Sequence, residues 1–317
     1  LYVERTENPL LLDEMLKFIA LDDERAKITM DSGNKVNYFP SKKVILPIDK
    51  NTIIKNKVVS PKFYDSIVPQ IEFTIKDRAL YKNRLMMLDI VNENNWKRPI
   101  YFTGGSNGED DYIWMKDYLQ LDGMCFKLVP IRTPVENPNP MEMGCIDSDK
   151  MYDIVMKWDW GNSESPNIYH DPETRKNSIS YRTNLARLMQ TLLNEGKKEK
   201  AEKVIDLAMA KMPLEYFEYY SLLEPFAEGY YKVGQREKGQ KILSKLIRKQ
   251  QEMLTFYSTW KASDQEFSAM DIMLDIEQYR SYLKVAKNAN DLEFYNKEKV
   301  KFNNYNKMLA HFGRKME

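Results

Sequence analysis

The sequence predicts an α+β protein. We expect a small α/β domain over residues 1–160, an ordered connector over 161–183 and an all-α helical repeat domain over 184–317. Three observations support this division. Twelve of the fourteen prolines precede residue 184, so the first part of the chain is broken into short elements. Short β-type runs alternate with helical runs there, as in βαβ units. A repeat with an offset of 38 residues follows in the second part.

Composition excludes several functional classes. The 317 residues suggest about two domains, and 43% hydrophobic with 30% charged residues is an ordinary globular balance. Lys plus Arg is 48 against 47 for Asp plus Glu, which argues against a nucleic-acid partner. No apolar run approaches the ~20 residues of a membrane helix. Two His and two Cys predict no metal site and no disulfide scaffold, and we expect no cofactor. Cys125 and Cys145 are interpreted as unpaired thiols, with a disulfide as the alternative.

Hydrophobic periodicity places the elements of the first part. The face formed by Leu12, Met15, Leu16 and Ile19 predicts the first helix, and Asp147 is a candidate N-cap for the last one. Helices are expected over 9–20, 80–94, 110–121 and 148–156. Strands are expected over 36–39, 43–46, 71–75, 99–102 and 126–131.

Two segments of the second part, 196–205 and 234–243, align without gaps. Gly196 and Gly234 stand where a first helix would end in a left-handed cap, and Pro213 follows the second helix of the first copy. Each copy resembles a tetratricopeptide repeat, although Met189 occupies a position where that pattern has a small residue. The offset exceeds the usual period of ~34, so we expect an extra turn over 214–221. Segments 266–287 and 291–311 predict a terminal helix pair.

The repeat resemblance implies a groove lined by the exposed residues of the first helices. These residues are Gln190, Asn194, Glu224, Glu228, Tyr231 and Lys232. Their mix of amide, acid and aromatic groups suits an extended peptide of basic or polar character. Alternatively, the short array closes its groove against the α/β domain, because two repeats expose little concave surface.

A second candidate site lies in the first part of the chain. Trp96 and Arg98 could bind a sugar or stack on a base, and a glycine-rich turn follows the next strand. Its glycines are Gly104, Gly105 and Gly108. Three carboxylates follow this turn and would repel a phosphate, so a simple strand-to-helix turn is the favoured interpretation. Trp96 is likewise more typical of a buried corner. His170 beside Asp171 lacks an identifiable nucleophile and is not assigned a catalytic role.

The runs 83–91 and 95–102 resemble a signature of a bacterial multispanning membrane-protein family of unknown function. That family is related to protein O-mannosyltransferases of the GT-C glycosyltransferase class. Four further runs fit it: 18–23, 38–40, 128–131 and 157–162. The resemblance covers the soluble C-terminal half of the family, which ends in tetratricopeptide-like repeats. It implies that the chain, which begins at Leu1 without an initiator Met, is part of a longer protein.

The resemblance carries no catalytic residue onto this chain, because the acids of the GT-C class lie in the membrane half. Whether the chain belongs to an enzyme is therefore left open. We expect a non-catalytic protein-interaction module on the periplasmic side of the inner membrane, attached through an N-terminal membrane half. It would recognise an acceptor or partner protein. The alternatives are a sugar- or nucleotide-binding α/β domain that contributes to a glycosyltransferase, and a structural lid on that membrane half.

Overall fold

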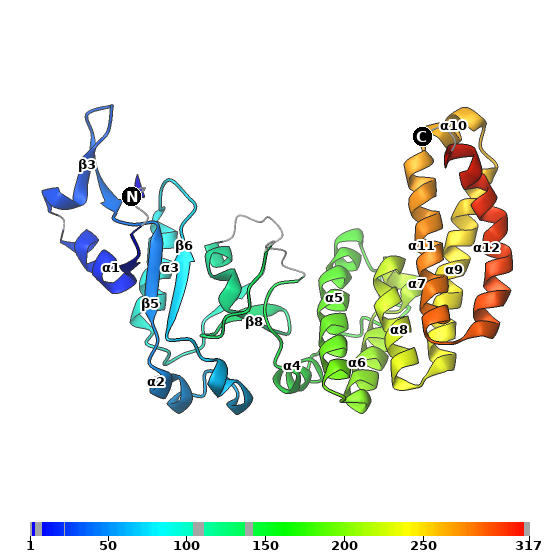
Figure 1. Ribbon diagram of the computed structural model, residues 1–317, viewed down its shortest axis with the longest axis horizontal. Coiled ribbons are helices and arrows are strands. Elements are labelled where there is room, and N and C mark those ends of the chain that lie inside the picture. Colours follow the sequence, from blue (N-terminus) through cyan, green and yellow to red (C-terminus); the bar gives the residue numbers. More distant parts are fainter. Residues whose placement is uncertain (1, 4–7, 22, 104–110, 137–141, 314–317) are drawn as a thin grey trace. The chain divides into compact units, whose positions relative to one another are not determined.

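The computed structural model divides into two compact units, Leu1–Met151 and Tyr152–Glu317 (Figure 1). It describes residues 2–3, 8–21, 23–103, 111–136 and 142–313. The first unit combines small sheets with helices, and the second is all helical among its described residues. The expected α+β class is therefore confirmed.

The described residues of the first unit form nine short strands. Its helices are α1 (Leu12–Ala20), α2 (Lys50–Lys55), α3 (Lys82–Glu93) and the start of α4 (Ser148–Val155), with 3₁₀ turns η1 (Glu24–Ala26), η2 (Pro61–Ser66) and η3 (Asp111–Tyr118). The strands are β1 (Tyr2–Val3), β2 (Leu10–Leu11), β3 (Lys27–Thr29), β4 (Lys35–Phe39), β5 (Lys43–Pro47), β6 (Gln70–Thr74), β7 (Tyr101–Thr103), β8 (Leu119–Asp122) and β9 (Cys125–Leu128).

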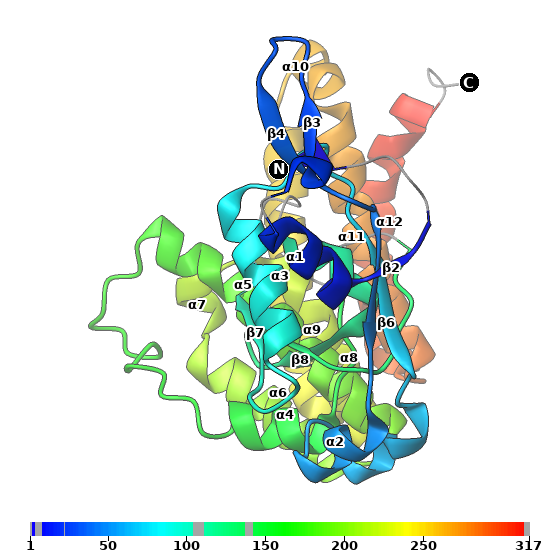
Figure 2. The ribbon, with the colours of Figure 1, turned by 90° about the vertical axis from the view of Figure 1, so that its left-hand side faces the viewer.

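These strands form three sheets of three, in the orders β1-β4-β3, β2-β5-β6 and β7-β9-β8. Alternation in β5 and β6 buries one face of the middle sheet, including Val44, Ile71 and Phe73. Helices α1 and α3 cover that face, and Leu12 and Leu88 join the same core (Figure 2). Burying these apolar side chains stabilises the sheet against the helices.

The pairing differs from the βαβ arrangement that the sequence suggested. Pairs β5–β6, β7–β9 and β8–β9 are antiparallel, while β2–β5 and β1–β4 are short parallel pairs. The helix expected over 110–121 is also wrong: the described part is η3, and β8 follows from Leu119. A two-residue turn with Gly123 at φ +72° returns β8 onto β9, because a tight hairpin needs a positive φ there.

The second unit stacks three helical hairpins, α5/α6, α8/α9 and α11/α12, in chain order (Figure 1). Its helices are α5 (Pro172–Asn194), α6 (Lys198–Lys211), α7 (Leu214–Phe217), α8 (Glu224–Val233), α9 (Arg236–Ser258), α10 (Ala262–Phe267), α11 (Ala269–Asn288) and α12 (Leu292–Gly313), with 3₁₀ turn η4 (Tyr220–Leu223) before α8. Helix α8 packs against both α5 and α6, and α11 packs against both α8 and α9.

Glycine and proline set the hairpin boundaries as the sequence predicted. Gly196 and Gly234 have φ of +77° and +90°, in the left-handed region where an L side chain would be strained. Helix α6 ends at Lys211, before Pro213. The extra residues between the two copies form α7 and η4, which accounts for the long offset.

Segment 161–183, expected as a connector, contains the first twelve residues of α5, which make about three helical turns. Asp171 accepts hydrogen bonds from the backbone N–H groups of Glu173 and Thr174, and Pro172 occupies the first helical position. These two local signals start α5 well before residue 184. The aromatic residues of this region pack with one another: the Trp158 and Trp160 rings lie 5.4 and 5.5 Å from that of Tyr181.

Candidate functional site

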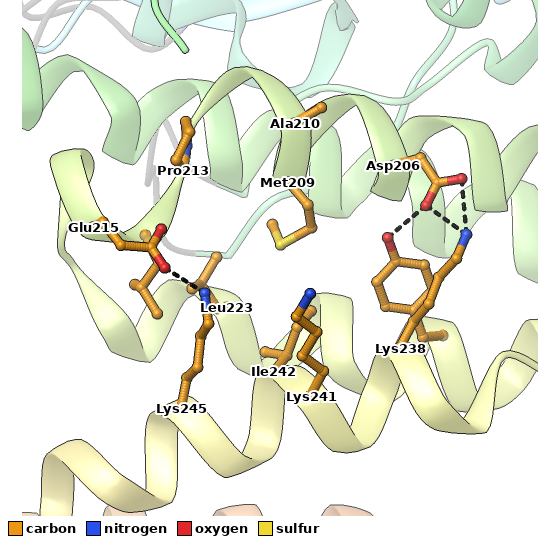
Figure 3. Close-up of a pocket in the computed structure, with 12 residues that line it drawn as sticks. Asp206, Met209, Ala210, Pro213, Glu215, Leu223, Lys238, Lys241, Ile242 and Lys245 are labelled. Atoms are coloured by element: carbon orange, nitrogen blue, oxygen red, sulfur yellow. Dashed lines mark hydrogen bonds and ion pairs between the residues drawn. The ribbon is translucent and has the colours of Figure 1, made fainter. Parts of the chain in front are cut away.

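A cavity of about 540 Å³ lies between the second helices of the first two hairpins, α6 and α9 (Figure 3). We call it the α6–α9 cleft. Its walls come from α6, α7 and α9, with Tyr230 of α8 at one end. It is lined by Asp206, Met209, Ala210, Pro213, Leu214, Glu215, Leu223, Tyr230, Lys238, Lys241, Ile242 and Lys245.

Helical spacing brings these side chains to one face of each helix. On α6, Met209 and Ala210 follow Asp206 by three and four residues; on α9, Ile242 follows Lys238 by four. The floor of the cleft is apolar and its rim is charged. This combination is common in sites that bind an apolar group and orient it with a few polar contacts.

Ion pairs close the two ends of the cleft. At one end, Asp206 accepts hydrogen bonds from Lys238 Nζ at 2.9 Å and from the hydroxyl of Tyr230 at 2.6 Å. At the other end, Lys245 donates to Glu215. The bond from Lys245 lowers the pKa of Glu215, and the bond to Asp206 raises the pKa of Lys238. Each end of the cleft therefore holds an ion pair at neutral pH, and the two charges of each pair neutralise each other.

Lys241 lies between these two ion pairs. It is exposed and forms no hydrogen bond or ion pair with any residue that the structure describes. Figure 3 shows it reaching from α9 toward Met209 on α6. One ammonium group therefore stands over the apolar floor without a carboxylate partner.

Arg182 of α5 holds the wall of this cleft and was not singled out by the sequence. Its side chain is fully buried and donates to the backbone oxygens of Met212, at 3.0 Å, and Glu218. Burial lowers the pKa of this guanidinium to about 10. Glu218 and Tyr219 both have positive φ, of 54° and 48°. Arg182 thus stabilises the tightly turned segment after α6 through hydrogen bonds to its backbone. The sequence could not indicate this role, because arginines on helices are usually exposed.

The residues of the predicted groove separate into two groups. Gln190 donates to Asn194 Oδ1 at 2.9 Å on α5, and Glu228 pairs with Lys232 at 2.8 Å on α8. These four side chains remain on the first helices, at least partly exposed.

The other two groove residues contact the third hairpin. The Tyr231 hydroxyl donates to buried Asp291 at 2.9 Å, and Ser281 of α11 donates to Glu224. Asp291 also accepts from Arg236 and Gln240. Burial acts against ionisation of Asp291, but these three donors outweigh it and lower its pKa. Glu224 and Tyr231 therefore join hairpins.

In the first unit, Trp96 has φ of +58° and is partly buried against the core. It lines a cavity of about 680 Å³ together with Asp49, Asn92 and Lys97. Arg98 is exposed and does not line this cavity. Gly104, Gly105 and Gly108 lie outside the described residues. The structure thus brings Trp96, without Arg98, to a candidate ligand cavity.

A buried polar network also occurs in the first unit, joining β7, β8 and α4. Asp122 accepts from Tyr101 at 3.0 Å, Gln120 at 2.7 Å and Lys150 at 2.8 Å. Nearby, Lys127 is buried and donates to the oxygen of Val58.

Burial, with Lys150 close by, lowers the pKa of Lys127 to about 8. This network depends on strand pairing, so the sequence alone did not indicate it.

Cys125 and Cys145 are free and partly buried, as the sequence interpretation favoured. His170 is packed: its ring stacks on Tyr216 at 5.6 Å, and its Nε2 lies 2.8 Å from the oxygen of Ser163. Within the described ranges, no group of three or more His, Cys, Asp or Glu is placed to hold a metal ion. None of the helices described there is long and apolar enough to cross a membrane.

The comparisons with known proteins concern the first unit. No curated protein and no solved structure matches the chain. Residues 2–150 match the family model described as TMEM260-associated domain 2.

Proposed function

We propose that this chain is a non-catalytic protein-interaction module, in which the helical unit binds a segment of a partner protein at the α6–α9 cleft. The observation that carries the proposal is the apolar floor of this cleft beneath the ammonium group of Lys241, which forms no ion pair with a described carboxylate. Burying a partner's apolar side chain on that floor would supply binding energy. A charge-assisted contact to Lys241 would orient it.

The same features define the chemistry of the partner segment. It would carry an apolar side chain, placed over Met209 and Ile242, beside a carboxylate that reaches Lys241. A basic segment would be repelled by Lys241, the lysine between the two ion pairs of the rim. A separate polar surface on the first helices could hold an extended peptide. It consists of the partly exposed Gln190 and the exposed Asn194, Glu228 and Lys232.

The wider setting belongs to the same proposal. The helical unit would be of the tetratricopeptide type, on the periplasmic side of a glycosyltransferase-like membrane protein, and would recognise an acceptor or partner there. Two left-handed glycines at a 38-residue offset support the repeat type. The TMEM260-associated match supports an association with a membrane protein.

A peptide selection tests the cleft. Displayed random 12-residue peptides would be selected on the whole chain and sequenced. We expect enrichment of apolar residues next to Asp or Glu, and about tenfold weaker binding of those peptides to Lys241→Glu. Lys203→Glu is the matched control, because Lys203 is an exposed lysine of α6 outside the cleft. Equal binding to Lys241→Glu, or an equal loss with Lys203→Glu, would contradict the assignment.

A second candidate function is binding of a sugar or nucleotide at the Trp96 cavity, favoured by its partly exposed indole and its size. Thermal unfolding with a panel of monosaccharides and nucleotides would detect it, because a ligand at a hundred times its Kd adds about 2.7 kcal/mol. The stabilisation should disappear in Trp96→Leu. If none of these ligands changed the unfolding temperature, this second candidate function would be excluded. The remaining alternative, a lid on the membrane half, predicts photo-crosslinks from Asn194 to that half alone.

A further inference from the structure

A second cavity, of about 500 Å³, lies between α11 and α12, the helices of the third hairpin. We call it the α11–α12 cleft. Four cationic residues line it: Arg280, Lys284, Lys287 and Lys299. Leu283 and Phe302 are buried at its base, and Tyr295 is half-buried in its wall. The α11–α12 cleft shares no lining residue with the α6–α9 cleft.

The charges of the α11–α12 cleft are one-sided. None of its lining residues is acidic. Arg280 pairs with Glu277 at 2.6 Å, whereas Lys284, Lys287 and Lys299 form no ion pair with any residue whose side chain is described.

Two further acids of this hairpin have partners outside the cleft. Glu298 of α12 pairs with Lys301 at 2.9 Å, and Asp291, in the turn between the two helices, binds Arg236 and Tyr231. The positive charge of the cleft is therefore not cancelled by these neighbours.

Aromatic rings bring the cations together. Lys287 Nζ and Lys299 Nζ lie 5.8 and 5.4 Å from the centroid of the single Tyr295 ring. The Arg280 guanidinium lies 5.7 Å from the Phe302 ring. Each ring face attracts a cation. Two ammonium groups near one ring repel each other, and an anion that contacts both would relieve that repulsion.

We propose that the α11–α12 cleft binds a ligand through its phosphoryl group. Several lysines that act as point charges suit a group with more than one negative charge and several acceptor oxygens. The amides of Asn288 and Asn303 line the same cavity and can donate to such oxygens. The apolar base can contact the organic part of the ligand, and the volume is that of a small-molecule site.

The chemistry leaves two sources of this group: a free phosphate ester and a phospholipid headgroup. Calorimetry at low ionic strength would measure the binding of inorganic pyrophosphate to the whole chain. This experiment tests the phosphoryl site itself. Co-sedimentation with phosphatidylglycerol vesicles, against phosphatidylcholine vesicles, distinguishes the sources. Competition of pyrophosphate with the anionic vesicles would assign the headgroup, and pyrophosphate binding without vesicle binding would assign a free ester.

The variants are chosen to preserve the fold. Lys287→Gln with Lys299→Gln should weaken pyrophosphate binding at least tenfold. Lys297→Gln is the control, because Lys297 is exposed on α12 and does not line the cleft. Thermal unfolding of each variant checks that the hairpin persists. No binding of pyrophosphate or anionic vesicles, or an equal loss with Lys297→Gln, would overturn the proposal. So would binding of poly-glutamate in place of pyrophosphate.

Discussion

Met189 of α5 fills the space that a side chain on Gly229 of α8 would need. A Cβ built on Gly229 would collide with Met189 Sδ and lie 2.9 Å from Ile205 Cδ1. Met189 was the one departure of the first copy from the tetratricopeptide pattern. The departure is compensated across the interface, because the large side chain on one hairpin faces a residue without a side chain on the next.

This relationship predicts the effect of Gly229→Ala. The added methyl group overpacks the interface, at a cost of about 1–3 kcal/mol. Alanine gains about 1 kcal/mol over glycine inside a helix, so we expect a net loss of up to about 2 kcal/mol in the free energy of unfolding. Met189→Ala removes the colliding sulfur but also opens a cavity, so Gly229→Ala should cost less in the Met189→Ala chain than in the unchanged chain. Urea unfolding of the two single variants and the double variant measures the coupling. Strictly additive effects would show that the two residues do not compete for one space.

Arg182→Met should destabilise the helical unit. The substitution keeps much of the apolar stem but leaves the backbone oxygens of Met212 and Glu218 without this donor, so we expect a loss of about 2–4 kcal/mol. Chemical denaturation measures it. Arg248→Met is the matched control, because that side chain is 81% exposed and should change stability by less than about 0.5 kcal/mol. Similar losses in both variants would contradict the role of Arg182.

The lowered pKa of buried Lys127 should make the stability of the protein depend on pH. The pKa of Lys127 is about 8 in the folded chain against an ordinary 10.5. Between these values the unfolded chain binds more protons than the folded chain, so the free energy of unfolding rises with pH. Below pH 8 both states are protonated, and the full cost of burying the ammonium is present.

We expect a gain of about 1–2 kcal/mol between pH 7.5 and 9.5, relative to Lys127→Met. Comparison with this variant cancels the opposite contribution of Cys145, whose pKa is raised. Urea unfolding at four pH values measures the difference. Parallel pH profiles for the two proteins would show that Lys127 titrates normally.

Cys145 should alkylate slowly in the folded protein. Burial raises the pKa of its thiol from 9.0 to about 11, and only the thiolate reacts. At pH 8 the thiolate fraction, and hence the rate with iodoacetamide, should be about a hundredfold lower than for an unperturbed thiol. Mass spectrometry of Cys125→Ser, folded and in urea, isolates this residue. Equal rates in the two conditions would contradict the burial.

Whether the sequence predicted a feature of this fold correctly depends on how local the sequence signal for that feature is. Left-handed glycines and Pro213 act over a few residues, so the sequence analysis predicted those hairpin ends well. The Asp171 cap is equally local, but it was not recognised, and the early start of α5 was therefore missed. Antiparallel pairing of β8 with β9 joins strands through one turn. The sequence nevertheless suggested a helix over part of that region, because apolar residues in so short a run do not distinguish the two periods.

The candidate sites show the same division. By itself, the sequence determined the α+β class and the ends of the first helices in the first two hairpins, because hydrophobic periodicity and turn residues depend on neighbouring positions in the chain. The groove that the sequence predicted on the first helices stays a prediction. Only the tertiary structure decided that Tyr231 joins hairpins, that Arg182 is buried, and that Lys241 stands over an apolar floor. Those outcomes depend on which helix faces which, and that choice is made by packing between residues distant in the chain.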